Sequence, residues 1–355
     1  MITQTGNGLK SYNYVITFVG IWLSLIGCQS SERKTSQSSR QITSAFYHWK
    51  TVYNPTHYET ELLNGLAVST LYLHFFDVDW DAKTRQPVPK AFIRFRQKPT
   101  GNVVPVVFIT NRTLVQLTAG AIPDLATHIT QAIQRISQQQ AIPLQEVQID
   151  CDWSLQTRDR YFRLLTLLKN QLRLPISATI RLHQIKYTDQ TGIPPVARGM
   201  LMLYNVADWK NPDTRNSIYD ADIASQYLSF VATYPLQLDL VLPLFRWTVV
   251  YRNNHFLTFL KNIDRTTLTN CRFLRSLDST RFVASRDTSA FGFSVRRDDL
   301  FRVEAVSAGT LIREKNRLLD QISNPQLTVA LYHLDSTVLS AYSRETIQSL
   351  VRPIP

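Results

Sequence analysis

The sequence predicts an α/β fold, a (β/α)8 TIM-like barrel with a long insertion between strands 7 and 8. Short apolar segments typical of buried strands alternate with segments of helical apolar spacing over about 310 residues, which is the count and length of such a barrel. No glycine-rich phosphate loop opens any of the expected helices. A doubly wound open sheet, which often carries such a loop, is therefore the less favoured alternative.

The expected elements alternate along the chain. Composition permits one large core, since 44% of the 355 residues are apolar. Apolar patterning predicts eight main strands, at 44–49, 69–77, 103–110, 147–153, 176–183, 199–205, 236–245 and 327–333. Helical spacing and capping residues predict helices at about 124–139, 157–173, 220–233 and 343–351. An extra strand is expected at 90–96, and about 248–326 is too long for one crossover, so it is expected to be an insertion or subdomain.

Near the N-terminus, residues 15–27 form an apolar segment that follows Lys10. It is too short to span a membrane and has the length of a signal-peptide core. Its end, Leu25-Ile-Gly-Cys28, resembles a bacterial lipoprotein signal, which implies residues 1–27 are removed and Cys28 is acylated. The resemblance implies a lipid-anchored envelope protein, and Gln29 favours the outer membrane. A buried segment with a chance cysteine is the alternative.

The remaining regions are a polar tether at 28–42 and a barrel at 43–355. The formal net charge is +12, but the basic residues are scattered and no helix carries a basic stripe. With an export signal, this pattern argues against nucleic acid as a partner. Anionic glycans or lipid headgroups fit better, and a merely solvated basic surface fits best. Cys151 and Cys271 are expected to be buried thiols without a disulfide.

The stretch Val147–Ser154 is the centre of the predicted site. Alternation places Gln148, Asp150 and Asp152 on one face of a strand. On the next strand, alternation places Arg181 and His183 inside the barrel. Since neighbouring strands lie about 4.8 Å apart, Arg181 is expected to reach Asp150, and His183 to reach Asp152.

Other polar and aromatic residues fall at the same predicted strand ends. The expected interior adds His74 and His333, and the expected rim contains Tyr47, Trp49, Asp77, Asp79, Asn111, Tyr204 and Trp247. Lys186 is expected close to His183, at the end of the next strand. Each has a plainer interpretation. Asp150 and Arg181 suit a structural ion pair, the acids at 77–81 suit a solvated turn, and the aromatic residues suit the core. No metal-ligating pattern occurs and no cofactor is expected.

Several segments resemble a known family. They are Phe46–Lys50, Phe76–Trp80, Gln148–Trp153, Ala178–Gln184 and Pro194–Met200. Together they are similar to a family of bacterial envelope lipoproteins related to the barrel superfamily of glycoside hydrolases. The resemblance covers about 43–250 and implies a glycoside-hydrolase-like barrel without implying a particular reaction.

A more distant likeness is to chitinase-type barrels, whose fourth strand ends in Asp-x-Asp-x-Glu with the glutamate as general acid. The matching positions here are Asp150, Asp152 and Ser154, so that acid is absent. Catalysis would then need Asp152 as proton donor, with Asp79 or Asp77 opposite.

Two functions follow from these residues. The first is a glycosidase-like enzyme in which Asp152, an acid of the 77–81 turn, His183 and Arg181 carry the chemistry. Trp49, Tyr47, Asn111, Lys186, Tyr204, Trp247 and His333 would then hold a glycan. The second is a non-catalytic glycan-binding or scaffold lipoprotein, which the missing glutamate favours.

Overall fold

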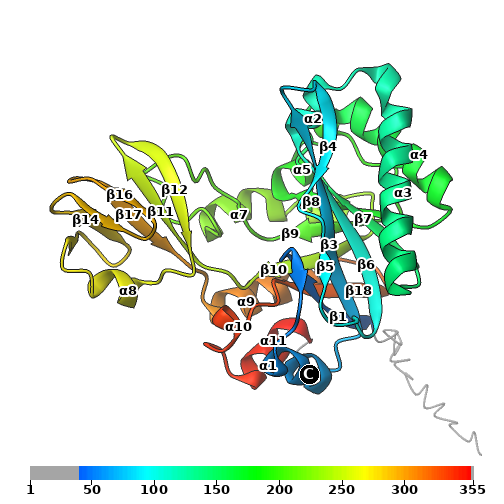
Figure 1. Ribbon diagram of the computed structural model, residues 1–355. Helices are drawn as coiled ribbons and strands as arrows, with labels where there is room; N and C mark the ends of the chain where they lie inside the picture. Colours follow the sequence, from blue (N-terminus) through cyan, green and yellow to red (C-terminus); the bar gives the residue numbers. More distant parts are fainter. Residues whose placement is uncertain (1–39, 353–355) are drawn as a thin grey trace, which may run out of the picture. The chain divides into compact units, whose positions relative to one another are not determined.

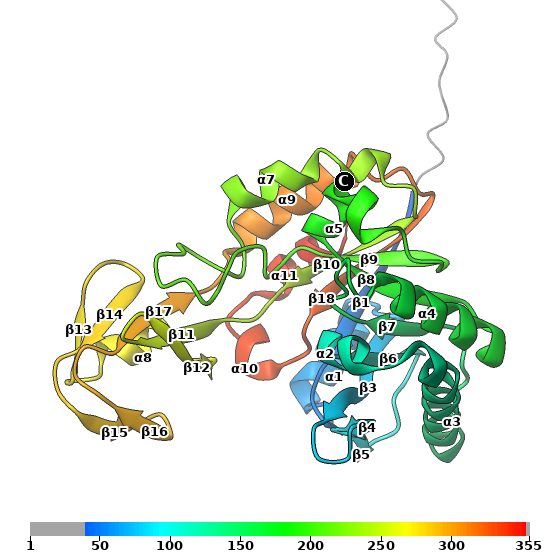
Figure 2. The ribbon, with the colours of Figure 1, turned by 90° about the horizontal axis from the view of Figure 1, so that it is seen from above.

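Residues 40–352 are described by the computed structural model of the chain, and the predicted signal peptide and Cys28 lie outside this range. Eight parallel strands form a closed barrel, in which β1 pairs with both β18 and β3 (Figures 1 and 2). In chain order they are β1 (Gln41–His48), β3 (Thr70–Asp81), β6 (Asn102–Ile109), β7 (Val147–Asp150), β8 (Ile176–Arg181), β9 (Arg198–Met202), β10 (Leu238–Pro243) and β18 (Gln326–Tyr332). The predicted (β/α)8 barrel is confirmed.

Helices follow most of these strands and cover the outside of the barrel. The longest, α3 (Ile122–Gln140), packs against α4 (Arg158–Leu172) beside β6 and β7 (Figure 1). Each buries one apolar face, as its helical spacing predicts. The others are α1 (His57–Gly65), α2 (Asn111–Gln116), α5 (Leu182–Lys186), α6 (Thr188–Thr191), α7 (Ala221–Leu228), α9 (Ala308–Leu319), α10 (Ser336–Leu339) and α11 (Arg344–Val351). Among the described helices, none has the length and apolarity needed to cross a membrane.

Two short strands occupy the region of the extra strand expected at 90–96. β4 (Gln86–Lys90) extends β3 as an antiparallel partner, while β5 (Arg94–Phe95) pairs with the short β2 (Val52–Tyr53). Prolines lack the N–H that a central strand needs, but an edge strand tolerates them, and both Pro87 and Pro89 lie in β4. Pairing with β4 continues β3 to Asp81, so the acids at 77–81 belong to a strand and not to a turn.

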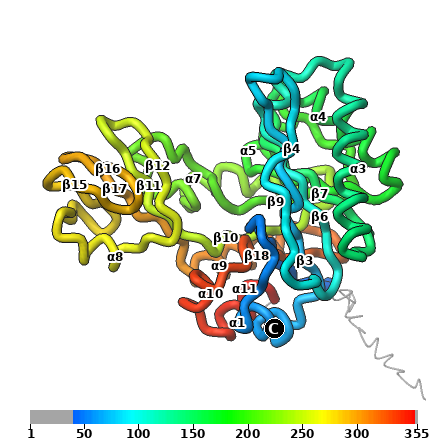
Figure 3. The backbone as a smooth tube through the Cα atoms, viewed as in Figure 1, coloured from blue at the N-terminus to red at the C-terminus, as the bar shows by residue number. Residues whose placement is uncertain are grey.

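The segment between β10 and β18 contains a second sheet (Figure 3). Its order is β12 (His255–Lys261), β11 (Trp247–Arg252), β17 (Leu300–Glu304), β14 (Arg281–Ala284) and β13 (Leu274–Ser276), all antiparallel. Val250, Phe282 and Phe301 belong to a small separate core. The helix α8 (Arg265–Thr269) and the hairpin β15 (Thr288–Ala290)–β16 (Phe293–Val295) complete this insertion. The chain then returns to the barrel through α9, which contacts β10 and α11.

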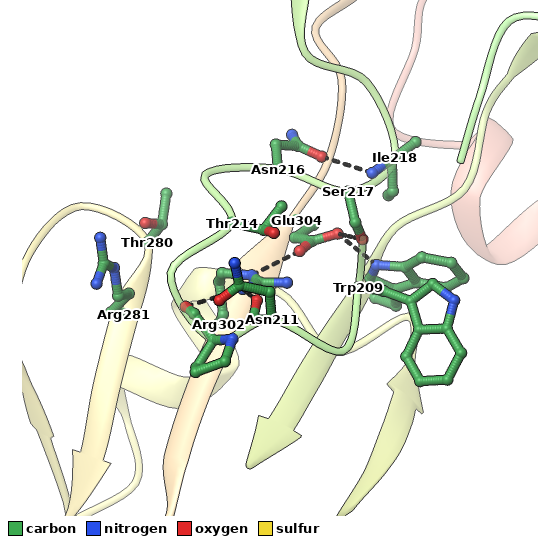
Figure 4. Close-up of polar contacts among 12 residues, drawn as sticks. Trp209, Asn211, Thr214, Asn216, Ser217, Ile218, Thr280, Arg281, Arg302 and Glu304 are labelled. Carbon is green, nitrogen blue, oxygen red and sulfur yellow. Dashed lines mark hydrogen bonds and ion pairs between the residues drawn. The ribbon is translucent and has the colours of Figure 1, made fainter. Parts of the chain in front are cut away.

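A fully buried ion pair joins this sheet to the loop between β9 and α7 (Figure 4). Arg302 Nε donates to Glu304 Oε1 at 2.6 Å, and neither side chain is exposed. Arg302 also donates to the carbonyls of Asn211 and Pro212, and Glu304 accepts from Ser217. Charges taken out of water need such partners, so this cluster fixes the loop against the sheet.

Replacing Arg302 with methionine should lower the free energy of unfolding by about 3–5 kcal/mol, because Glu304 would stay buried without its cation. Urea denaturation of the full chain measures this. The matched control is Arg313→Met, since Arg313 is 65% exposed in its pair with Glu314, and exposed pairs contribute less than about 1 kcal/mol. Similar losses in the two variants would contradict the buried role of Arg302.

Candidate functional site

A cavity of about 640 Å³ opens at the carboxyl ends of the barrel strands. This is the end at which barrels of this class carry their sites. The cavity is lined by Trp49, Lys50, Thr51, Phe108, Asp150, Asp152, Arg181, Met202, Tyr204, Asn205, Phe245, Arg246, Trp247, Lys261, Asn262, Tyr332, His333 and Asp335. The residues come from the ends of several strands and from the base of the insertion.

Asp152 and Arg181 form the ion pair of this cavity. Arg181 Nε and Nη2 donate to the two Asp152 oxygens at 2.5 and 3.0 Å. The expected pairs, Arg181 with Asp150 and His183 with Asp152, are wrong. Strand register explains the difference, since Gln148 pairs with Ser177, which places Arg181 beside the loop that holds Asp152.

Asp150 ends β7, is 5% exposed and accepts a hydrogen bond from Thr179 Oγ1 at 2.6 Å. Burial, followed by the negative charge of Asp152, raises the pKa of Asp150 to about 6, although Arg181 and Thr179 act in the opposite direction. Desolvation disfavours a charged carboxylate. Asp150 is therefore a carboxyl of this cavity that can exchange a proton near neutral pH.

Asp77 and Asp79, the expected opposing acids, do not line the cavity. Arg112 and Lys90 form ion pairs with Asp79 at 2.6 and 3.0 Å. Partial burial acts in the opposite direction, but these bonds hold the pKa of Asp79 well below its usual range. Asp77 contacts His74 Nε2 at 2.6 Å. Both carboxylates are thus occupied by partners outside the cavity.

Four other predicted site residues also lie outside the cavity lining. His183 is exposed on α5, because β8 ends at Arg181 and the chain turns into a helix. Lys186 lies over the rings of Tyr187, Tyr227 and Phe230. Asn111 accepts a hydrogen bond from Thr157, and Tyr47 is buried beneath the cavity with its hydroxyl on Gln148.

Trp49, Tyr204, Trp247 and His333 line the cavity as predicted. They belong to an aromatic wall in which ring centroids lie 5.6 Å apart for Trp49 and Tyr332, and 5.3 Å apart for Tyr204 and Tyr332. The Trp247 indole N–H donates to Glu304 at 2.7 Å, which holds the ring at the edge of the cavity. Burial lowers the pKa of His333 to about 4, so its ring is neutral at pH 7.

Other lining residues were missed from the sequence. Lys50 lies two residues after β1 and forms an ion pair with Asp335 at 3.2 Å. Arg246 precedes the insertion, and both residues could have been found by their positions at strand ends. Lys261 and Asn262 lie within the insertion, at the end of β12. The rule that barrel sites form at the carboxyl ends of barrel strands does not extend to strands of an insertion.

Ser154 occupies the position at which the chitinase pattern has its glutamate, but it does not line the cavity. Its backbone N–H donates to Thr157 Oγ1 at 2.9 Å, at the start of α4. Within residues 40–352, no cluster of three or more His, Cys, Asp or Glu residues could hold a metal ion.

Comparison with solved structures finds several barrels of the same architecture. The spore cortex-lytic enzyme SleL of Bacillus cereus aligns with TM-score 0.50 and 12% identity, over 88% of this chain and 75% of that chain. A chitinase from Chromobacterium violaceum aligns with a TM-score of 0.51 and 11% identity, over 87% of this chain and 99% of that chain. A chitinase-like agglutinin from Robinia pseudoacacia aligns with a TM-score of 0.50 and 10% identity, over 86% of this chain and 99% of that chain.

The likeness is one of fold. No family model and no curated protein matches the chain by sequence. The chain therefore has a (β/α)8 barrel similar in fold to those of a spore cortex-lytic enzyme, a chitinase and a chitinase-like agglutinin.

The raised pKa of Asp150 should make stability depend on pH. Between its ordinary pKa of 3.8 and about 6, the folded state holds a proton that the unfolded chain has released. Stability contributed by this group therefore falls as pH rises through that window. The wild type should lose stability between pH 4 and pH 6 while Asp150→Asn should not, so the difference in their urea-denaturation midpoints should shift in favour of the variant as pH rises.

Thr179→Val provides the matched control for this pH effect. It removes the hydroxyl that favours the charged form of Asp150, so the upper end of the window should move to higher pH while the lower end, set by the unfolded chain, stays in place. Parallel pH profiles for the wild type and Asp150→Asn would contradict the assignment.

Proposed function

We propose that the chain is a saccharide-binding barrel whose ligand occupies the cavity at the carboxyl ends of the strands. One observation carries this proposal: the cavity combines the partly buried aromatic residues Trp49, Trp247 and Phe245 in its wall with polar groups at its floor and edge. Sugar rings present apolar C–H faces and peripheral hydroxyls, so they suit a pocket with aromatic surfaces and a few convergent polar groups. The volume of about 640 Å³ is within the usual range for small-ligand sites.

Binding fits this geometry better than the hydrolysis expected from the sequence. The expected general acid, Asp152, is held by both nitrogens of the Arg181 fork. The expected partner Asp79 lies outside the cavity in its own ion pairs. Glycosidases use two carboxyl groups that flank the scissile bond, and these two carboxylates do not face one another across the cavity.

Hydrolysis is the second candidate, and one observation favours it. Asp150 lines the cavity with a pKa raised to about 6, which is the property that a general acid needs near neutral pH. In this version Asp150 takes the role that the sequence assigned to Asp152.

Calorimetric titration of the purified chain with oligosaccharides of chitin, peptidoglycan, cellulose and uronic acids tests the binding proposal. At least one should bind, and Trp49→Ala should weaken it by about tenfold or more, because a central aromatic contact contributes strongly. Trp80→Ala is the matched control, since Trp80 lies in β3 outside the cavity. Absence of binding, or equal losses in both variants, would overturn the proposal.

The same titrations separate binding from hydrolysis. Product analysis of each bound oligosaccharide would detect turnover. Cleavage by the wild type that Asp150→Asn abolishes, with binding retained, would assign hydrolysis to this cavity. Intact oligosaccharide after prolonged incubation would leave binding as the function.

We propose further that this barrel is tethered to the cell envelope, at the outer membrane, by lipid on Cys28. The support is the apolar segment before Cys28 and the polar segment after it. Two acyl chains hold a protein stably at a bilayer, whereas one chain is marginal.

Metabolic labelling of bacteria with an alkyne fatty acid tests the anchor. The wild-type chain should carry the label and sediment with membranes, and Cys28→Ala should lose both properties. Cys271→Ala is the control, because Cys271 lies in the insertion and is partly exposed. An unlabelled wild-type chain would refute lipidation.

A further inference from the structure

Two cations at the edge of the cavity have no carboxylate partner among the described residues. Of the four basic side chains in the lining, Arg181 is paired with Asp152 and Lys50 with Asp335. Arg246 and Lys261 form no ion pair within residues 40–352. Asp152 and Asp335 are therefore paired with Arg181 and Lys50, and Asp150 at the floor is the remaining acid of the lining.

Arg246 and Lys261 lie at the same end of the β11–β12 pair, one register position apart. β11 and β12 run antiparallel with Trp247 opposite Lys261, and the Asn262 N–H donates to the Arg246 carbonyl at 3.2 Å. We call Arg246, Lys261 and Asn262 the basic rim. Trp247 lies within this rim, stacked on Phe259 with ring centroids 4.4 Å apart.

Around the same cavity lie buried polar atoms that have no hydrogen-bond partner within the described part of the chain. They are Arg246 Nε, Arg181 Nη1, the Tyr204 hydroxyl and His333 Nδ1, and their four residues all belong to the lining. Tyr204 is 4% exposed. A buried donor without an acceptor costs free energy, and ligand oxygens placed here would recover it.

The nearby carboxylate Asp264 does not neutralise the rim. It caps α8 by accepting from the Thr267 N–H at 2.9 Å. Hydrogen bonds from Thr267 are the main cause that holds the pKa of Asp264 below its usual range, and Arg246 makes a smaller contribution. Arg246 and Asp264 form no ion pair, so the guanidinium stays available to a ligand.

We propose that the cavity selects acidic saccharides, whose carboxylate is bound by Arg246 and Lys261 while a sugar ring lies against Trp247. This inference rests on the proposed saccharide binding and names its substrate class. Guanidinium groups bind carboxylates through paired, charge-assisted hydrogen bonds. A neutral sugar would leave both cations without a counterion.

The experiment compares acidic oligosaccharides with neutral derivatives of the same length. Hyaluronan, alginate, polygalacturonate and muramic-acid-containing oligomers are titrated into the wild-type chain, each beside its carboxyl-reduced form. At least one acidic oligomer should bind about tenfold or more tightly than its reduced form. Raising the salt concentration should reduce this difference, because exposed charges are screened.

Variants of the basic rim locate the effect. Arg246→Gln/Lys261→Gln should bind the acidic and reduced forms about equally. The control Lys83→Gln/Arg85→Gln removes the same charge from the exposed turn between β3 and β4, and should keep the wild-type preference. Circular dichroism verifies the fold of each variant.

The outcomes distinguish the two proposals. If saccharides bind but the acidic and reduced forms are bound equally by the wild type, the selection for acids is wrong and saccharide binding stands. If the control variant loses the preference as the rim variant does, the effect belongs to net charge and the rim assignment is wrong. If no saccharide binds, both proposals fail.

Discussion

The register between β7 and β8 decides what the cavity of this barrel can do. Ile149 pairs with Ala178, so the following residues, Asp150 and Thr179, meet inside the barrel. Two residues further along, Arg181 meets Asp152 at the mouth. One carboxyl thereby receives a hydroxyl and a raised pKa, and the other receives a guanidinium. A shift of two residues would keep the same faces inward but place Arg181 opposite Asp150 and His183 opposite Asp152, because alternation repeats every two residues.

This register also marks the limit of prediction from the sequence. Alternation placed Asp150 and Arg181 inside the barrel correctly, but alternation fixes only the face of a strand and not its offset from the neighbour. The eight strands were predictable because each is a compact apolar segment. Asp79 was misplaced because its environment depends on β4, whose prolines obscured the strand. His183 was misplaced because β8 ends at Arg181, and strand ends are poorly determined by pattern.

The insertion contributes to the cavity through a chain of buried contacts that no local pattern reveals. Glu304 accepts from Trp247 at the cavity edge, binds Arg302 in the sheet and accepts from Ser217 in the loop after β9. One carboxylate therefore links the second sheet, the loop and the Trp247 ring that lines the cavity. Its burial is tolerated because every oxygen has a partner. The second sheet thus positions part of the cavity wall in addition to carrying its own core.

Charge is distributed unevenly in this cavity, and the distribution connects its two proposed activities. The floor holds Asp150, whose pKa is raised to about 6, while the edge holds Arg246 and Lys261. An acidic ligand bound at the edge would add a negative charge to the same low-dielectric space. That charge disfavours ionisation of Asp150, as Asp152 already does. Occupation of the basic rim would therefore favour the protonated form of Asp150, the form in which a carboxyl can donate a hydrogen bond or a proton to a bound sugar.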